Sequence, residues 1–337
     1  MVGRKVSIAD IATAAGVSTA TVDRVLNRRG GVSAMKEDRV LAAARLLGMD
    51  RALDRPPSRT LRIAVLIQPP ANPFHAALRE GLDLAARIYA AFNMQFFVHH
   101  IDPKNPAGIA ATVRECHAYN GLIITSPDDG RIREAIKALS RTIPVVTLAT
   151  DVAGCGRAAY IGPDDHKSGR VAGDLMGLFL RQEGGRLLIV AGSRDITGHR
   201  QREAGFRQII AERYPACHVM AVLETGEEQA AAGRVVEVAF RQDPALRGIY
   251  HLSAGAGPIV AALQRLGRLA DTVIITHELT EDRRRLLKAR RLAAVIDQQP
   301  LLEARMAVET MAKLHGRMAG EAASVATDIQ IFLAENA

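Results

Sequence analysis

Apolar residues recur at helical spacing in three short segments within the first 50 positions. A first helix is predicted from residue 8 to about residue 15, with Ser7 as its N-cap and Gly16 as the residue that ends it. Ser18 can cap a second helix that ends near Asn27, and Ser33 can cap a third that ends near residue 47. The apolar faces of the three helices are formed by Ile8, Ile11, Ala12 and Ala15, by Val22, Val25 and Leu26, and by Val40, Leu41, Ala44 and Leu47.

Two short helices joined by a glycine turn and closed by a third helix are typical of a helix-turn-helix unit. The second helix of such a unit enters the major groove of DNA. Its solvent-facing side would here carry Thr19, Ala20, Asp23 and Arg24. From the spacing alone, an ordinary three-helix cap on a larger domain is an alternative.

A different pattern begins at Leu61, where aliphatic runs alternate with amphipathic stretches. Continuous aliphatic strands separated by helices predict parallel sheets covered on both faces. The number of runs favours two doubly wound subdomains, with a (β/α)8 barrel as the alternative. Residues 50–60, "DRALDRPPSRT", predict a linker between the two parts. The nine runs are "LRIAVLI", "MQFFVHH", "GLIITS", "IPVVTLA", "RLLIVAG", "HVMAVLE", "GIYHLS", "TVIITHE" and "LAAVIDQ".

The positive charge of the chain is concentrated at its N-terminus. Residues 1–60 contain 11 basic and 6 acidic side chains, whereas the other 277 residues contain 33 and 30. A basic unit on a nearly neutral body suggests that the unit binds a polyanion. A solvated basic surface would explain the same charge.

The first 50 residues also resemble a known family. "VSIADIATAAGVSTATVDRVLN" and "VSAMKEDRVLAAARLLGM", which lie within residues 6 to 49, are similar to the galactose–lactose repressor family of bacterial transcription regulators. In that family the exposed start of the second helix reads bases, which here implies Thr19, Ala20 and Arg24. Arg24 can donate two hydrogen bonds to guanine, and the small side chains can contact a thymine methyl.

The resemblance further implies phosphate contacts and a hinge. Phosphates would be bound through Ser7, Ser18, Thr21, Asn27 and Ser33. Asp23 departs from the family, which usually has Ser there, and we interpret it as orienting Arg24. In the hinge of the family a Leu enters the minor groove. Leu53 is the candidate here, but the joint is short, and its two prolines oppose a hinge helix.

The body resembles the sugar-binding periplasmic protein fold that the same family uses, which favours two lobes over a barrel. The segments that carry this resemblance are "IPVVTLATD", "YIGPDDHKSGRVAGDLM", "GHRQREAGFR", "HELT" and "VIDQQP". It implies that the chain crosses between lobes near Pro163, Asp297 and Val325. We therefore predict a DNA-binding domain at 1–49, a linker at 50–60 and a ligand-binding and dimerisation body at 61–337. The N-lobe would comprise 61–163 and 298–324, and the C-lobe 164–297 and 325–337.

Open α/β sheets bind ligands at the carboxyl ends of their strands. The polar side chains and one aromatic ring expected there can bind several hydroxyl groups and stack on a sugar face. Other interpretations are a surface pair between Asp151 and Arg202, a helix cap for Glu278 and a backbone contact for Gln298. The predicted pocket residues are Asn72, Phe74, His75, Asp151, Arg202, Glu278 and Gln298.

Two departures from the family widen the range of effectors. Gly255 and Ala256 stand where the family often has an Asn-Asp pair, and Ala149 stands at the usual acidic position. The pocket is therefore expected to lose polar contacts and to admit a substituted or phosphorylated sugar. The effector is expected to be a sugar, a sugar alcohol or a sugar phosphate. The segment "SAGAG" could present backbone amides to an anion.

Motifs for catalysis, metal binding and membrane insertion are not recognisable. "HELTE" lacks the second histidine of a zinc-protease helix, and His99 and His100 have no ligand partners at metal spacing. The N-terminus does not read as a signal peptide, and no apolar run is long enough to span a membrane. Three scattered cysteines fit a reducing cytoplasm. We expect no enzyme activity, metal or cofactor.

These observations predict a cytoplasmic, ligand-responsive transcriptional regulator that acts as a repressor. It would bind a palindromic operator as a homodimer, because one helix-turn-helix covers about half of a useful site. The alternative function is that of a sugar-binding protein without a regulatory role.

Overall fold

The N-terminal unit consists of three helices in the computed structural model, which describes residues 6–27, 29–49 and 59–337. They are α1 (Ile8–Ala15), α2 (Thr19–Leu26) and α3 (Ala34–Leu46). A reciprocal capping box starts α1: the Ser7 side chain accepts from the backbone of Asp10, whose carboxylate accepts from the Ser7 backbone. Gly16 ends the helix in the left-handed region, at φ 60°. The three predicted helices are confirmed.

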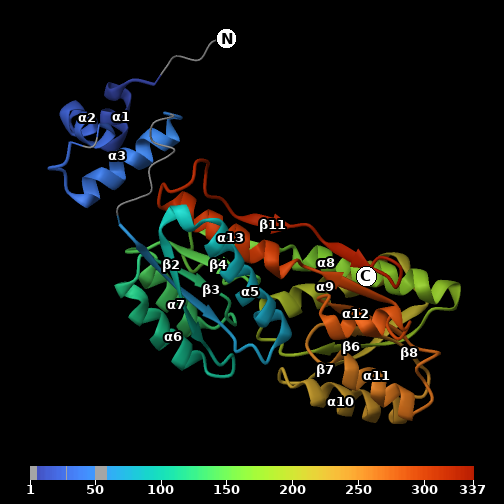
Figure 1. Cartoon of the computed structure of the whole chain (residues 1–337). Helices are drawn as coiled ribbons and strands as arrows, with labels where there is room; N and C mark the ends of the chain where they lie inside the picture. Colours follow the sequence, from blue (N-terminus) through green and yellow to red (C-terminus); the bar gives the residue numbers. More distant parts are fainter. Residues whose placement is uncertain (1–5, 28, 50–58) are drawn as a thin grey trace.

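Small aliphatic side chains fill the space between these helices. Ile11, Val22, Val40 and Ala44 are completely buried at the centre. Figure 1 shows the unit at one end of the molecule, beside the first lobe of the body. Leu53, the candidate for the minor-groove contact, lies outside the described residues.

The first lobe of the body, which we call the N-lobe, is built on a parallel sheet in the order β11-β5-β4-β3-β1-β2. Helices α5 and α13 cover one face, where Leu78, Leu82 and Val308 are buried, and α6 and α7 cover the other. The elements are β1 (Leu61–Ile67), α5 (Pro73–Ile88), β2 (Met94–His100), α6 (Pro106–Glu115), β3 (Gly121–Ile124), α7 (Gly130–Leu139), β4 (Val145–Leu148), β5 (Ala159–Pro163), α13 (Pro300–Leu314) and β11 (Val325–Thr327).

The second lobe, the C-lobe, repeats this arrangement in the order β12-β10-β9-β8-β6-β7. Its strands are parallel except β12, which pairs antiparallel with β10. Helices α8 and α9 pack on one face, and α10, α11 and α12 on the other. The elements are α8 (Asp165–Leu180), β6 (Gly185–Ala191), α9 (Thr197–Arg213), β7 (Cys217–Glu224), α10 (Gln229–Gln242), β8 (Leu246–His251), α11 (Ala256–Arg265), β9 (Val273–His277), α12 (Glu281–Lys288), β10 (Ala294–Asp297) and β12 (Gln330–Phe332).

Two open sheets exclude the barrel alternative and confirm the predicted fold class. All nine predicted runs form strands, and β5, β11 and β12 are added to them. The third passage between the lobes is later than predicted: β11 pairs with β5 of the N-lobe, so the chain crosses after Thr327 rather than at Val325. A three-residue strand has too weak a pattern to place this passage from sequence. In the described part of the chain, no helix is both long and apolar enough to cross a membrane.

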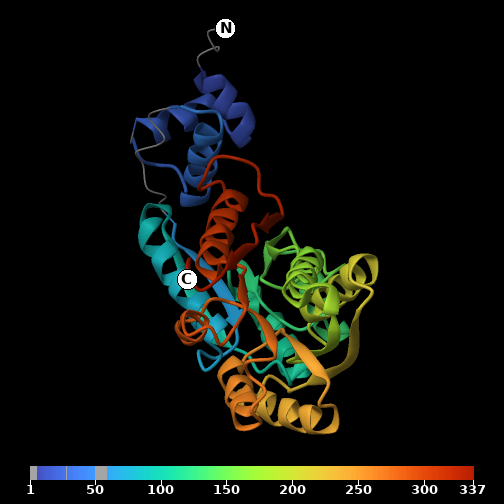
Figure 2. The ribbon, with the colours of Figure 1, turned by 90° about the vertical axis from the view of Figure 1, so that its right-hand side faces the viewer.

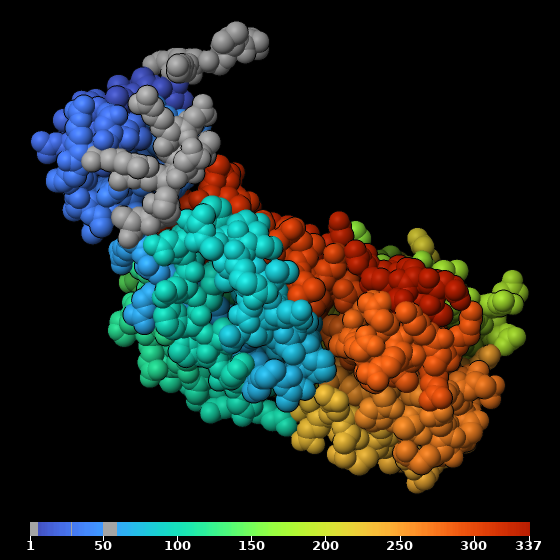
Figure 3. Space-filling view, in the orientation of Figure 1, coloured from blue at the N-terminus to red at the C-terminus, as the bar shows by residue number. Residues whose placement is uncertain are grey.

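The two lobes touch at the mouth of the space between them. Lys104 lies 3.4 Å from Glu228, and Arg200 lies 3.5 Å from Asp128, each pair joining one lobe to the other. Figure 3 shows the N-lobe, in cyan, in direct contact with the orange and gold C-lobe. The view in Figure 2 places the helical unit beyond the N-lobe, next to the end of α13. The polar cleft described below therefore lies between lobes that are in contact.

Candidate functional site

Helix α2 presents its polar side to solvent. Thr19, Ala20 and Arg24 are exposed, whereas Val22 and Val25 are buried against the other two helices. Ser18 caps the helix by accepting a hydrogen bond from the backbone of Thr21. The predicted base-reading residues are thus held on a rigid surface and are free of the packing that stabilises the unit.

Asp23 does not orient Arg24 as predicted. Its carboxylate accepts from Asn27 at 2.6 Å and from Arg29 at 2.8 Å. Residues one position apart do not face each other on a helix, whereas residues four apart do, which is why Asn27 and not Arg24 meets Asp23.

The predicted phosphate-binding residues occupy the starts and ends of the three helices. Ser7 and Ser18 use their hydroxyls as caps, and Thr21 shares a hydrogen bond with Ser18. Ser33 begins α3 without a side-chain cap hydrogen bond and is exposed. Their contacts with phosphate stay a prediction.

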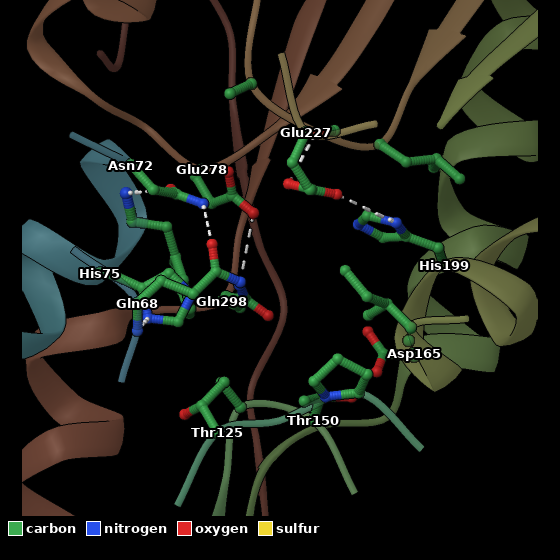
Figure 4. Close-up of a pocket in the computed structure, with 18 of the residues that line it drawn as sticks. Gln68, Asn72, His75, Thr125, Thr150, Asp165, His199, Glu227, Glu278 and Gln298 are labelled. Carbon is green, nitrogen blue, oxygen red and sulfur yellow. Dashed lines mark hydrogen bonds and ion pairs between the residues drawn. The ribbon is translucent and has the colours of Figure 1, made fainter. Parts of the chain in front are cut away.

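A polar cleft lies between the lobes at the carboxyl ends of both sheets. Figure 4 shows side chains from the N-lobe facing side chains from the C-lobe across it. Most of them follow a strand directly, because parallel strands present their carboxyl ends at one edge of the sheet. The lining residues are Gln68, Asn72, Phe74, His75, Thr125, Ser126, Pro127, Ala149, Thr150, Asp165, Ile196, Gly198, His199, Arg202, Glu227, Leu252, Ser253, Ala254, Glu278 and Gln298.

Arg202, on the first turns of α9, is the centre of a buried network. It donates to Asp165 at 2.7 Å and to the amide oxygen of Gln298 at 2.8 Å. Glu278 lies 3.9 Å from Arg202 and pairs with Arg283 at 2.9 Å. Burial would lower the pKa of Arg202, but Asp165 and Glu278 raise it, so that the guanidinium stays charged. A surface pair between Arg202 and Asp151 is thereby excluded.

The start of α5 supplies the N-lobe side of the cleft. Asn72 caps the helix by accepting from the backbone of Phe74 at 3.1 Å, and its amide donates to Gln68 at 3.3 Å. His75 is buried, and burial together with His100 lowers its pKa to about 3, so its ring is neutral. Six of the seven predicted pocket residues line the cleft, though their contact with an effector stays a prediction.

Asp151 is the one predicted pocket residue that does not reach the cleft. Its carboxylate turns back toward β4, where it pairs with Arg157 at 2.5 Å and accepts from Thr147 at 2.9 Å. Its neighbours Ala149 and Thr150 line the cleft in its place. Asp151 follows β4 as expected, but its carboxylate pairs with Arg157 and therefore points away from the cleft.

Sequence reasoning missed Asp165, His199 and Glu227. Asp165 lies in the quoted segment "YIGPDDHK", and its partner is 37 residues away in the chain. Glu227 follows the seventh strand, so the rule that selected Glu278 would also have selected it. His199 opens α9, and no strand run marks it.

Glu227 has an unusual environment. Its backbone is in the left-handed region, at φ 64°. Its carboxylate accepts from the Ser253 hydroxyl at 3.2 Å and lies 3.9 Å from His199. Burial, together with the nearby Glu278, raises the pKa of Glu227 to about 7. Burial and Arg202 lower the pKa of His199 to about 4, so that this ring is neutral at pH 7.

The segment 253–257 leads from β8 into the start of α11, with Gly255 as the N-cap, and its binding of an anion stays a prediction. Gly255 is in the left-handed region at φ 118°, and an added Cβ would lie 2.7 Å from the Gln229 carbonyl. Ser253 and Ala254 line the cleft, but Gly255 and Ala256 do not. The described residues contain no group of acidic, histidine and cysteine side chains that could hold a metal.

Comparison with protein families identifies both parts of the chain. A model described as "Periplasmic binding protein domain" matches residues 63–318. A model described as "Bacterial regulatory proteins, lacI family" matches residues 7–49. The chain therefore joins a DNA-binding domain of the lacI family to a body that belongs to the periplasmic binding protein domain family. It is a DNA-binding transcriptional regulator.

Curated relatives of this regulator include both regulators and binding proteins. It is 25% identical to the maltose regulon regulatory protein MalI of Escherichia coli, over 73% of this chain and 71% of the relative. It is 24% identical to the ribose import binding protein RbsB of Haemophilus influenzae, over 83% of this chain and 94% of the relative. These relatives are a regulator and a binding protein.

Solved structures show the fold of the body. A glucose-galactose binding protein from Geobacillus stearothermophilus covers 83% of this chain and 99% of its own, with a TM-score of 0.75 and 18% identity. A solute binding protein from Burkholderia graminis, in complex with D-arabinose, covers 83% and 97%, with a TM-score of 0.74 and 22% identity. At this identity the likeness establishes the two-lobed fold.

Proposed function

We propose that the chain is a repressor that acts in the cytoplasm, binds a two-fold symmetric operator as a homodimer, and senses a sugar or sugar alcohol in the inter-lobe cleft. The observation that carries this proposal is the union, in one chain, of an exposed reading helix and a buried polar cleft. A binding protein without a regulatory role has no use for the first of these. The relatives and solved structures that resemble the chain are regulators and sugar-binding proteins, which supports a function without catalysis.

The DNA half of the proposal rests on α2. Arg24 is exposed on the same helix as Thr19 and Ala20, and its guanidinium can donate two hydrogen bonds to the major-groove edge of guanine. The helix has only eight residues, so one unit reads a short half-site. Two copies related by a two-fold axis supply a full site.

The effector half rests on the donors and acceptors in the cleft. Arg202, Asp165 and Gln298 offer a guanidinium, a carboxylate and an amide, which together can bind vicinal hydroxyl groups. Phe74 lies in the same lining and offers an aromatic ring to an apolar sugar face. The three carboxylates of the cleft disfavour a sugar phosphate, so we propose a neutral or cationic polyol. RbsB, by its name, binds ribose.

Closure of the lobes can couple the two halves. The effector touches both lobes and would favour the arrangement in which they meet, as only differential affinity for two arrangements can shift an equilibrium. The N-lobe contacts the DNA unit in this structure: Arg317 lies 3.5 Å from Asp38 of α3 and donates to the Arg59 carbonyl at 2.9 Å. Movement of the N-lobe can therefore change the position of α2.

Selection of bound sequences from a random DNA library by the full chain tests this function. We expect a symmetric site, bound by two copies, whose occupancy changes when a sugar or sugar alcohol is added. Arg24→Ala should relax the base preference within each half-site. Selection of no preferred sequence by the wild-type chain would favour the alternative of a sugar-binding protein.

A further inference from the structure

Glu227 places a buried carboxylate in the cleft with one oxygen unused. Its Oε2 accepts from Ser253, whereas its Oε1 is inaccessible to solvent and has no hydrogen-bond partner within the described residues. The ring of His199 is 3.9 Å from Oε1, beyond hydrogen-bonding distance. A buried acceptor that receives no hydrogen bond destabilises the folded chain. We therefore expect a bound ligand to donate a hydrogen bond to this oxygen.

The charges of the cleft are balanced everywhere except at Glu227. Asp165 pairs with Arg202 at 2.7 Å, and Glu278 pairs with Arg283 at 2.9 Å. In the described chain no arginine or lysine forms an ion pair with Glu227; Lys104 reaches the adjacent Glu228 at 3.4 Å instead. His199 is neutral at pH 7 and supplies no charge. When Glu227 is ionised, its negative charge is therefore uncompensated.

The local backbone holds the carboxylate in this position. An added Cβ on Gly192, at the end of β6, would lie 1.5 Å from Glu227 Oε1, so the position of the carboxylate requires glycine there. Glu227 itself takes a left-handed conformation, which is unfavourable for a residue with a side chain. The missing side chain of Gly192 and the left-handed backbone of Glu227 together keep the carboxylate facing the cleft (Figure 4).

We propose that the effector is a polyhydroxylated compound with an amino group, and that Glu227 binds this amine. This inference rests on the proposed function and narrows its effector class. The ammonium group would donate to Oε1 and supply the missing positive charge, while the hydroxyl groups bind near Arg202, Asp165 and Gln298. A hydroxyl in place of the amine would leave the charge of Glu227 uncompensated, and a phosphate would add a second negative charge beside it.

The pH dependence of binding follows from the groups around Glu227. The charged groups that act on Glu227 are Glu278 after β9 and Lys104 after β2, and the ring of His199 on α9 lies 3.9 Å from it. Because the Glu227 carboxylate must be ionised to bind an ammonium, the affinity for the amine should rise as the pH increases from 6 to 8. The affinity for a neutral sugar should not show this rise.

Calorimetry and thermal shift with the full chain test the inference. The probes are matched sets: D-glucose, D-galactose and D-ribose, the corresponding amino sugars and amino alcohols, and the corresponding phosphates. We expect an amine to raise the melting temperature more than its hydroxyl counterpart does. Glu227→Gln should then lower the affinity for that amine by about 10- to 100-fold, as expected for loss of a charge-assisted hydrogen bond.

Glu224→Gln is the matched control. It removes the same charge three residues away, from an exposed side chain that accepts from the Arg194 backbone within the C-lobe and lies outside the cleft lining. We expect this variant to bind the amine as the wild type does. An equal loss in both variants would show a general electrostatic effect and would overturn the assignment of Glu227.

The results of these experiments distinguish failure of the amine assignment from failure of the proposed function. If a neutral sugar or a phosphate binds better than its amine, or if Glu227→Gln binds the amine normally, the amine assignment is wrong while the sensing of sugars stands. If no probe of any set stabilises the wild-type chain, both the effector class and the amine assignment are refuted.

Discussion

The DNA unit and the cleft differ in how far their recognition residues also stabilise the fold. The proposed reading residues Thr19, Ala20 and Arg24 lie within six positions of one helix, are exposed, and contribute little to packing. The cleft residues come from the ends of strands and helices in both lobes, and several are buried and paired with each other. Recognition is separated from stability in the first region and linked to it in the second.

This difference predicts how substitutions behave. A change on the outer face of α2 should alter DNA affinity and leave the free energy of unfolding unchanged. A change in the cleft should alter effector affinity and stability together, because the removed side chain leaves a buried partner behind.

The largest effect is expected for Arg202→Ala. Removal of the guanidinium leaves Asp165 buried without its partner, so the free energy of unfolding should fall by about 3–5 kcal/mol. The response of operator binding to the effector should also be lost. Chemical denaturation and DNA binding with and without effector measure the two effects.

A conservative variant keeps this prediction testable if Arg202→Ala does not fold. Arg202→Lys retains the charge but cannot make both hydrogen bonds at once with the same geometry. It should fold and bind operator, with a weakened effector response. A full response in Arg202→Lys would contradict the role given to the guanidinium.

Glu227 should give the wild-type chain a distinct pH dependence of stability. Its pKa is about 7 in the folded chain, well above that of an unfolded glutamate, so the folded state binds the additional proton between about pH 4.5 and 7. The contribution of Glu227 to stability is therefore present at low pH and is lost as the pH rises through 7. Relative to Glu227→Gln, the wild type should lose about 3 kcal/mol over this range.

Denaturant unfolding at a series of pH values measures this difference. Subtracting the curve of Glu227→Gln removes the contributions of the other titrating groups. A difference that is flat with pH, or that increases with it, would show that the carboxylate is ionised in the folded chain and already compensated.

Arg24→Ala should have a smaller effect, confined to DNA. Loss of a bidentate contact with guanine should weaken binding to the selected operator by about 1–3 kcal/mol. Binding to random DNA should change less, and the free energy of unfolding should stay within about 0.5 kcal/mol of the wild type. Equal losses on operator and random DNA would reassign Arg24 to phosphate contact.

Asp151→Asn is expected to have the smallest effect and to leave effector affinity unchanged. It therefore tests whether Asp151 lies outside the cleft. The substitution weakens the partly exposed pair with Arg157, so the free energy of unfolding should fall by about 1 kcal/mol. Effector affinity should not change, because the carboxylate faces away from the cleft. A specific loss of effector affinity measured by calorimetry would restore Asp151 to the site.

The helices of the DNA unit and most strands of the body could be predicted from the sequence because local interactions specify them. Ser7 and Asp10 act within the first turn of α1, and Gly16 ends its last turn. Each aliphatic run of the body is recognisable from its own residues alone. The edge strands β11 and β12 have three residues each. Such short strands depend on their neighbours in the sheet and could not be predicted.

The sequence by itself determined which residues follow the strands, and so which side chains could meet. Only the tertiary structure decided which of them do: Asp151 turns to Arg157, whereas Asp165 reaches Arg202 and Glu227 is left without a charged partner. The physical reason is that capping and periodicity act over a few residues, while the pairing of buried charges depends on side chains that folding brings together from distant parts of the chain.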